Sequence, residues 1–163
     1  MLLTVWRHGE SGPGSPDFER TLTDRGARDI ECGARAFVAR LQQSSLPLPS
    51  LVLFSRWVRT TQTAQGLCFA LPGVSSETLE ALIPDSGVDT VEHALLDYAA
   101  RADLHIVLVS HQPLVSALIN HCLGTKGEVP VLVPGAYAVL DTPLVASGCA
   151  SLLWWSAPPE YQV

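Results

Sequence analysis

The sequence predicts an α/β protein, a single-domain three-layer α/β/α sandwich with a mostly parallel central sheet and helices on both faces. Short apolar runs suited to buried strands alternate with segments whose apolar residues recur at helical spacing. The length of 163 residues fits one domain, residues 1–163. Hydrophobic residues make up 47% and charged residues 16%, which excludes a disordered chain and a coiled coil.

The first half of the chain contains two predicted strands and two predicted helices. The first strand runs into a loop at residues 9–17, which is rich in glycine and proline. Thr23 is positioned to cap the first helix, and Pro47 and Pro49 break the chain after it. The expected strands are 2–6 and 51–54, and the expected helices are 27–41 and 57–70.

The second half repeats the alternation and ends in two strands. Residues 74–87 have a mixed pattern, which we interpret as a short strand followed by a loop around Pro84 and Gly87. Pro113 suits the first turn of a helix that ends at Gly124. The expected helices are 88–102 and 114–123, and the expected strands are 105–109, 136–140 and 151–155.

Charge and composition narrow the function classes. The net charge of −6 disfavours binding to a nucleic-acid backbone. No segment reaches the roughly 18 apolar residues that span a bilayer, and Arg7 interrupts the first apolar run. The four cysteines form no CxxC pair and no zinc-site spacing, so we expect packing residues in a reducing compartment. We therefore expect a cytoplasmic protein with no nucleic-acid partner, no membrane partner and no metal.

Basic side chains follow three of the predicted strands. In α/β sheets, ligands bind beyond the carboxyl ends of the strands. The residues at these ends are Arg7 and His8, then Arg56 and Arg59, then His111 and Gln112. Arginine presents a rigid fork of donors that matches phosphoryl oxygens, and the helix after Gln112 offers free backbone N–H groups. The pattern predicts a phosphoryl-binding site in which one neutral imidazole attacks phosphorus and the other donates a hydrogen bond.

The motifs at these positions resemble those of the histidine phosphatase superfamily, the phosphoglycerate-mutase-like group. They are RHG at 7–9, LTDRG at 22–26, SRWVRTTQT at 55–63 and VSHQPLV at 109–115. Together the ordered motifs span residues 2–119. The short chain, the SHQP form at 110–113 and LIPDSG at 82–87 resemble the small SixA-type phosphohistidine phosphatases.

The resemblance implies roles for individual residues. His8 would be the nucleophile, transiently phosphorylated on one ring nitrogen while a backbone carbonyl holds the other. Arg7 and Arg59 would clamp the phosphoryl oxygens, and His111 would donate to the transferring group. Water would then hydrolyse phospho-His8 without any cofactor or metal.

Further positions follow from the same comparison. Arg20 matches a basic position of SixA-type chains and is expected, with Gln112, to contact the substrate. Arg56 stands where many relatives have proline, so we expect it at the rim. The remaining histidines are expected outside the site: His93, His105 and His121.

The family pattern is incomplete at two places, and this bears on the substrate. The asparagine usual after the RHG motif is missing from residues 10–17, and only Glu80 or Asp85 is placed to act as a general acid. An alcohol leaving group needs a proton in the transition state, whereas an imidazole, with a pKa of about 6.5, can leave already protonated. The lack of a clear general acid therefore favours a substrate in which phosphorus is bonded to nitrogen, a P–N substrate.

We therefore expect a phosphatase acting on phosphohistidine in a protein. Family resemblance alone suggests a histidine phosphotransfer domain or a sensor kinase as the phosphorylated partner. Two alternatives remain open: a broad phosphomonoesterase acting on small phosphorylated substrates, and a catalytically idle module that binds phosphoproteins.

Overall fold

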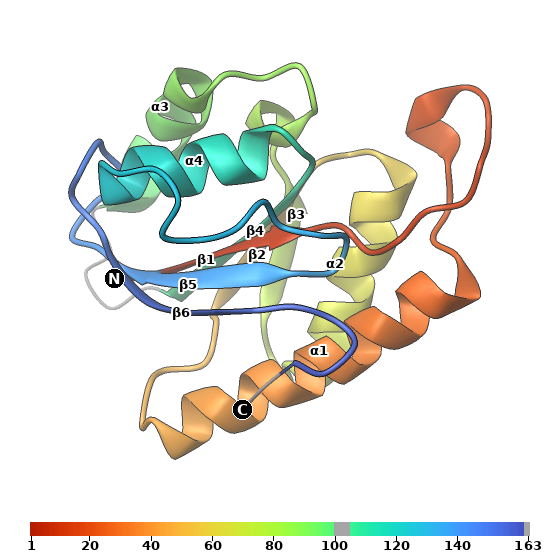
Figure 1. The fold of residues 1–163 in the computed structure, drawn as a ribbon, viewed down its shortest axis with the longest axis horizontal. Helices are drawn as coiled ribbons and strands as arrows, with labels where there is room; N and C mark the ends of the chain where they lie inside the picture. The colour runs from red at the N-terminus through yellow and green to blue at the C-terminus, as the bar shows by residue number, and fades with distance from the viewer. Residues whose placement is uncertain (100–104, 162–163) are drawn as a thin grey trace.

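A six-stranded sheet organises the computed structural model, which describes residues 1–99 and 105–161 (Figure 1). The strands are β1 (Leu2–Arg7), β2 (Leu51–Phe54), β3 (Ser75–Thr78), β4 (His105–Ser110), β5 (Tyr137–Asp141) and β6 (Ser151–Ser156). The helices are α1 (Asp24–Gln43), α2 (Val58–Ala70), α3 (Val88–Ala99) and α4 (Leu114–Leu123), with 3₁₀ turns η1 (Asp17–Glu19) and η2 (Glu80–Leu82).

The strands lie in the order β3-β2-β4-β1-β5-β6. Four of them, β3, β2, β4 and β1, run parallel to one another. The strand β5 runs antiparallel to both β1 and β6. The predicted α/β architecture with a mostly parallel sheet is confirmed.

Helices cover both faces of the sheet, as the apolar strands require. Figure 1 shows α1 below the sheet and α3 and α4 above it. The alternation of side chains along β1 illustrates the division, because Trp6 packs in the cluster with α1 and α2, whereas Val5 packs in the cluster with α4. Both side chains are fully buried. The expected three-layer arrangement is confirmed.

Local chemistry explains where the helices begin and end. The Thr23 hydroxyl accepts a hydrogen bond from the backbone N–H of Gly26 at 2.9 Å, so α1 begins at residue 24, before the first predicted apolar position. Gly124 ends α4 with a φ of 69°, in the left-handed region. The helix predicted from residue 88 is present up to residue 99, and its expected last part, residues 100–102, lies outside the described residues.

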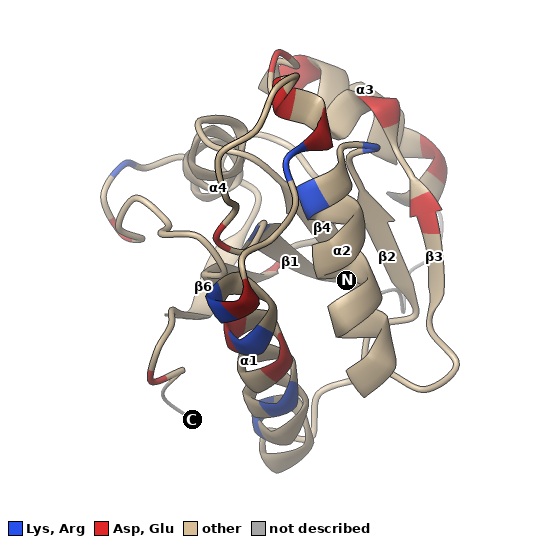
Figure 2. Cartoon of the chain, turned by 90° about the vertical axis from the view of Figure 1, so that its right-hand side faces the viewer, with Lys and Arg blue, Asp and Glu red and all other residues tan. Residues whose placement is uncertain are grey.

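The long helix α1 has a charged outer face, which Figure 2 shows as alternating blue and red segments. Two i,i+4 ion pairs lie on it, Arg25 with Asp29 and Arg35 with Glu31. Four of the eight arginines in residues 1–59 therefore lie on this helix and not in the cavity described below.

The cysteine prediction is partly wrong. All four cysteines are free, but only Cys122 is fully buried. Cys32 lies on the charged face of α1 and Cys149 in a surface turn, so both thiols are exposed. Among the described helices, none combines the length and apolar character needed to span a membrane.

Candidate active site

Two histidines meet at one edge of the sheet because their strands are neighbours. The strands β1 and β4 pair in parallel register, with Arg7 opposite Ser110. The residue after each of these positions is a histidine, and the His8 backbone N–H donates to the Ser110 carbonyl at 3.0 Å. The ring centroids of His8 and His111 lie 5.1 Å apart.

The His8 ring is held in one tautomer. Its Nδ1 lies 2.7 Å from the Gly9 carbonyl oxygen, which can only accept, so Nδ1 carries the proton. The Arg59 Nε–H donates to the remaining nitrogen, Nε2, at 3.2 Å. Burial, opposed by the Gly9 contact and reinforced by Arg59 and Arg7, lowers the pKa of His8 to about 4. The ring is therefore neutral at pH 7, with its Nε2 lone pair available.

Arg59 lies at the start of α2 and points into the site. Its side chain is buried, and its guanidinium lies 4.6 Å from the centre of the Trp57 ring. The NH1 group donates to the Asp17 carbonyl at 2.7 Å, and the NH2 group donates to the Asp17 carboxylate at 3.2 Å. Burial lowers the pKa of Arg59, while Asp17 acts in the opposite direction.

Arg7 and Gln112 are both fastened to the segment that precedes β5. The Leu132 carbonyl accepts from Arg7 NH1 at 2.7 Å and from Gln112 Nε2 at 3.2 Å. The amide of Gln112 also donates to the Ser116 hydroxyl at 2.7 Å. The Nε of Arg7 is buried without a hydrogen-bond partner within the described residues. These contacts hold the side chains of Arg7 and Gln112 in place beside Leu132.

His111 has two buried ring nitrogens, and neither has a hydrogen-bond partner among the described residues. The side chain is only 2% exposed and contacts the Trp57 ring edge-on, with centroids 5.0 Å apart. Burial, together with repulsion from His8 and Arg59, lowers the pKa of His111 to about 3. Because an unpaired buried polar group is costly, this imidazole marks a position where a ligand would complete the site.

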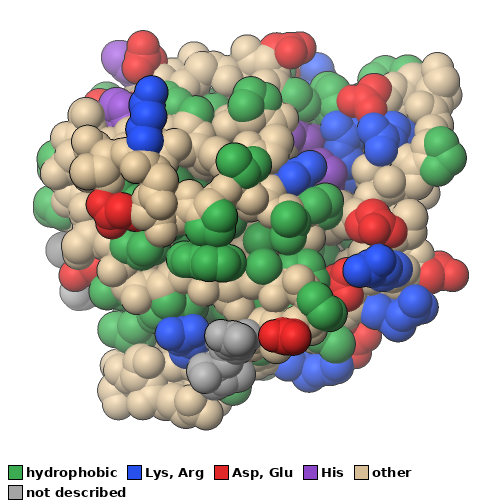
Figure 3. All heavy atoms as spheres, in the orientation of Figure 1, with side chains coloured by type: hydrophobic (Ala, Val, Ile, Leu, Met, Phe, Trp, Pro, Cys, Tyr) green, Lys and Arg blue, Asp and Glu red, His purple; other side chains and the backbone are tan. Residues whose placement is uncertain are grey.

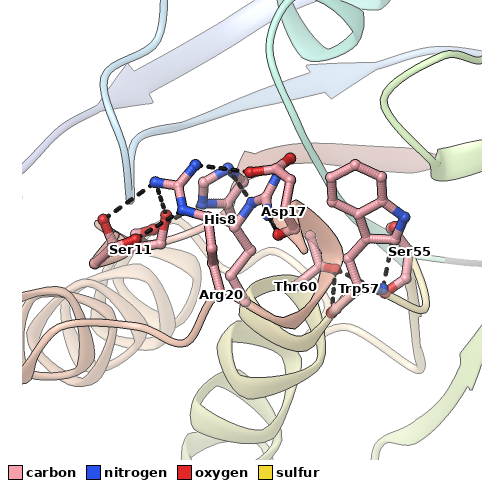
Figure 4. Close-up of polar contacts among 10 residues, drawn as sticks. His8, Ser11, Asp17, Arg20, Ser55, Trp57 and Thr60 are labelled. Carbon is pink, nitrogen blue, oxygen red and sulfur yellow. Dashed lines mark hydrogen bonds and ion pairs between the residues drawn. The ribbon is translucent and has the colours of Figure 1, made fainter. Parts of the chain in front are cut away.

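Arg20 reaches the site from the loop after β1, as the close-up in Figure 4 shows. Its Nε donates to the Gly12 carbonyl at 2.7 Å, its NH1 to the Asp17 carboxylate at 2.8 Å, and its NH2 to the Ser11 hydroxyl at 3.0 Å. A bridge between Ser11 and Leu22 closes the base of this loop.

A cavity of about 330 Å³ joins these side chains. Its lining residues are Arg7, His8, Glu10, Ser11, Asp17, Arg20, Arg59, Pro84, His111, Gln112 and Pro134. All six site residues predicted from the sequence are in this set. In the space-filling view, histidine and arginine surfaces lie side by side at this end of the molecule (Figure 3).

The sequence reasoning missed Asp17, which contacts two of the three arginines in the cavity. A signal was present in the chain, because Asp17 stands three residues before Arg20, a spacing at which opposite charges meet in a helical turn. Hydrogen bonds from Arg20 come first among the causes that hold the pKa of Asp17 below its ordinary value. Its carboxylate is therefore ionised at neutral pH.

The two candidate general acids lie outside the cavity. Glu80 pairs with Arg56 at 3.4 Å, and both side chains are about two-thirds exposed, at 66% and 65%. Asp85 borders a separate hollow beside Phe18 and Trp57. The expected rim position of Arg56 agrees with this placement.

The remaining histidines also lie away from the cavity. His105 is buried between the Thr4 hydroxyl and the Pro47 carbonyl. His121 pairs with Glu92 at 2.8 Å, and His93 is exposed on α3. Within residues 1–99 and 105–161, no group of three or more histidine, cysteine or carboxylate side chains is placed to hold a metal ion. The three cavity arginines instead favour an anion.

The fold of this chain is similar to the folds of several solved phosphatase structures. The solved structure of the protein histidine phosphatase SixA complexed with tungstate superposes with a TM-score of 0.80 at 26% identity, covering 97% of each chain. A SixA-type structure from Agrobacterium tumefaciens gives 0.75 at 23% identity, covering 97% of this chain and 98% of that one. A mycobacterial glucosyl-3-phosphoglycerate phosphatase gives 0.70 at 16% identity, covering 96% and 99%.

One curated protein is similar to this chain in sequence. An uncharacterized protein of Picosynechococcus sp. is 31% identical over 116 residues, which are 69% of this chain and 67% of that protein. No protein-family model matches the chain. By its fold, this chain belongs with the histidine phosphatase superfamily. Its own paired histidines and its cluster of arginines lie at one edge of the sheet. Within that superfamily, its resemblance is to the small SixA-type proteins.

Proposed function

We propose that this chain is a phosphatase that works through a phosphohistidine intermediate on His8, and that its substrate is phosphohistidine in a protein. The observation that carries the proposal is the state of His8. Its Nδ1–H is committed to the Gly9 carbonyl, and its Nε2 lies among the arginine donors. A histidine phosphotransfer domain or a sensor kinase is the proposed partner. Residues 1–163 are proposed to form one catalytic domain that acts in the cytoplasm.

The first step forms a bond between His8 Nε2 and phosphorus and breaks the bond between phosphorus and the leaving imidazole. That imidazole takes the electron pair and departs carrying its proton. Negative charge on the transferring oxygens is stabilised by the guanidiniums of Arg7 and Arg59. His111 lies opposite His8 and is neutral, so it can donate one N–H to the same oxygens.

The second step is attack of water on phospho-His8, which forms inorganic phosphate and restores the imidazole. The Gly9 carbonyl holds the Nδ1 proton through both steps, so Nε2 alone gains and loses the phosphoryl group. Arg7 is held by the Leu132 carbonyl, so its guanidinium needs little reorganisation.

The carboxylates around the cavity support a P–N substrate. Glu80 is exposed on a surface ion pair. Asp17 borders the cavity, but its lowered pKa keeps it ionised, so it has no proton to give to an alkoxide. An imidazole leaving group does not need such a proton.

The rim of the cavity supports a macromolecular substrate. Phe18, next to Asp17, is 50% exposed. Val131 and Val133 flank the Leu132 anchor and are 75% and 47% exposed. We take these three exposed side chains, which are next in sequence to residues at the cavity, as part of the proposed contact surface for another protein. The tungstate bound by the solved SixA structure is a tetrahedral oxyanion like phosphate, which supports a phosphoryl ligand here.

Rates on different substrates test the proposal. The purified protein is assayed with phosphoramidate, a phosphohistidine peptide and a set of sugar phosphates, and kcat/KM is compared. We expect the P–N substrates to be hydrolysed faster. Faster turnover of sugar phosphates would instead indicate a phosphomonoesterase. Inactivity on every phosphate, with phosphoprotein binding retained, would indicate a binding module.

A further inference from the structure

Asp17 contacts two of the three cavity arginines, at donors that an oxyanion would also use. We propose that the Asp17 carboxylate is an internal competitor of the phosphoryl group, which must release Arg20 and Arg59 when phosphate enters. The competition weakens the binding of product phosphate and so favours its release. This inference rests on the proposed function, because it assumes that the cavity binds a phosphoryl group.

The contacts of Asp17 are divided between the two guanidiniums. Its Oδ1 accepts from Arg20 NH1 at 2.8 Å, and its Oδ2 accepts from Arg59 NH2 at 3.2 Å. A carboxylate with its two oxygens on two arginines imitates two oxygens of a phosphoryl group. In the view of Figure 4, Asp17 is drawn between His8 and Trp57.

Every nitrogen of both guanidiniums already donates to a protein acceptor, and at most the second N–H of a terminal nitrogen stays uncommitted. Each of the three nitrogens of Arg59 donates, to His8 Nε2, to the Asp17 carbonyl and to the Asp17 carboxylate. The three nitrogens of Arg20 donate to Gly12, Asp17 and Ser11. A phosphoryl group that binds both guanidiniums along these directions therefore has to displace the carboxylate.

Burial indicates which partner can move. The Asp17 side chain is 53% exposed, whereas that of Arg59 is 6% exposed. No residue of η1 is buried, so the turn can shift without exposing core. Arg59 is fixed by the body of α2 and by its contact with Trp57. The carboxylate can therefore rotate into solvent while the arginines stay in place.

The charges around the cavity are consistent with Asp17 competing with a phosphoryl group for the arginines. Arg7, Arg20 and Arg59 contribute three positive charges to the cavity, and Asp17 offsets one of them. Glu10 also borders the cavity, but its carboxylate accepts from the Thr23 hydroxyl at 2.8 Å and contacts none of these arginines. Removing the Asp17 charge should therefore raise the affinity for a dianion without disturbing another carboxylate.

The test compares Asp17→Asn with Glu19→Gln, which removes the same charge from an exposed position on the same turn. The inhibition constants of inorganic phosphate and tungstate are measured, together with KM and kcat. We expect Asp17→Asn to lower both inhibition constants by roughly three- to tenfold, the range expected for a partly exposed charge-assisted contact, and to lower KM more than kcat. Glu19→Gln should leave all of these values within about twofold of the wild type.

A second variant separates competition from a loss of structure. Asp17→Glu keeps the charge and should keep the inhibition constants near the wild-type values, and circular dichroism checks that each variant is folded. Unchanged or weaker phosphate binding by folded Asp17→Asn would overturn the inference, because it would assign Asp17 a purely supporting role. If the wild-type protein binds neither phosphate nor tungstate, it is the proposed function that fails.

Discussion

The imidazoles of His8 and His111 face each other across one cavity, with ring centroids 5.1 Å apart. Burial comes first among the causes that lower both pKa values, and each ring is neutral at pH 7. The tautomer of His8 is fixed by the Gly9 carbonyl. The ring nitrogens of His111 have no hydrogen-bond partner within the described part of the chain. This asymmetry fits the proposed roles of His8 as the nucleophile and of His111 as a hydrogen-bond donor.

Replacing the nucleophile should abolish turnover. We expect His8→Ala to reduce kcat to background, because the variant lacks the Nε2 atom that lies beside Arg59 and is proposed to accept the phosphoryl group. Acid-stable and acid-labile phosphate on the protein are measured after rapid mixing with phosphoramidate, and the wild type should carry the acid-labile form. The control is His93→Ala, an exposed histidine on α3. Undiminished hydrolysis by His8→Ala would show that another residue is the nucleophile.

Removing the buried arginine should mainly damage transition-state stabilisation. We expect Arg59→Ala to lower kcat/KM by roughly 10²–10³-fold, as for the loss of one donor to a developing charge. The pKa of His8 should rise, because Arg59 now helps to lower it. The matched control is Arg56→Ala, three residues earlier and 65% exposed, which should keep kcat/KM within about threefold. Equal losses in the two variants would contradict the assignment.

The Glu80 carboxylate should contribute little to a P–N substrate. Its partner is the exposed Arg56 and it does not border the cavity, so we expect Glu80→Gln to keep kcat within about tenfold of the wild type. The measurement is kcat on a phosphohistidine peptide. A loss above about 10²-fold, the lower end for general acid catalysis, would show that this side chain moves into the site and protonates the leaving group.

A glycine in the LTDRG motif should be essential for stability. A Cβ on Gly26 would clash with the Glu10 carbonyl oxygen, so the strand-to-loop segment would have to move. We expect Gly26→Ala to lower the free energy of unfolding by about 1–3 kcal/mol or more in urea titrations. Gly87→Ala is the control, because a Cβ there meets no atom within 4 Å. Similar stability of both variants would contradict the close approach.

Stability should fall at mildly acidic pH because of buried neutral histidines. Burial lowers the pKa of His105 from 6.5 to about 4. Below pH 6.5 the unfolded chain binds a proton that the folded chain does not bind, so stability is lost as pH falls from about 6.5 to about 4. We expect His105→Gln to lower Tm at pH 7 and to reduce the slope of Tm across this window. His93→Gln should leave the slope unchanged, and a similar slope in both variants would contradict the assignment.

The sequence alone was sufficient to predict the helices and strands, which follow from local periodicity. It was also sufficient to predict which residues lie at the ends of the strands. The alternation of apolar runs predicted the layers, and the parallel strands brought Arg7, His8 and His111 to one edge. The inward reach of Arg20 and Asp17 was harder to predict, because it depends on a loop closed by the Ser11 bridge. Such a loop has no periodicity, and only the i,i+3 spacing of its opposite charges hinted at the contact.

The exposure of two cysteines shows another limit. Cysteine is usually a buried residue, but Cys32 faces outward because its position on α1 is set by the apolar stripe of Ile30, Ala34 and Phe37. Residue type alone gave the wrong environment, whereas the helical phase of its neighbours would have given the right one.

The register between β1 and β4 has a consequence for how such a protein can diversify. Arg7 is opposite Ser110, so the spacing of the two imidazoles is set by main-chain hydrogen bonds inside the sheet. The loops that carry Phe18 and Val131 are attached outside this frame. Insertions and substitutions in those loops can therefore change which molecules are admitted while the reacting pair keeps its geometry. Partner choice can evolve separately from the chemistry.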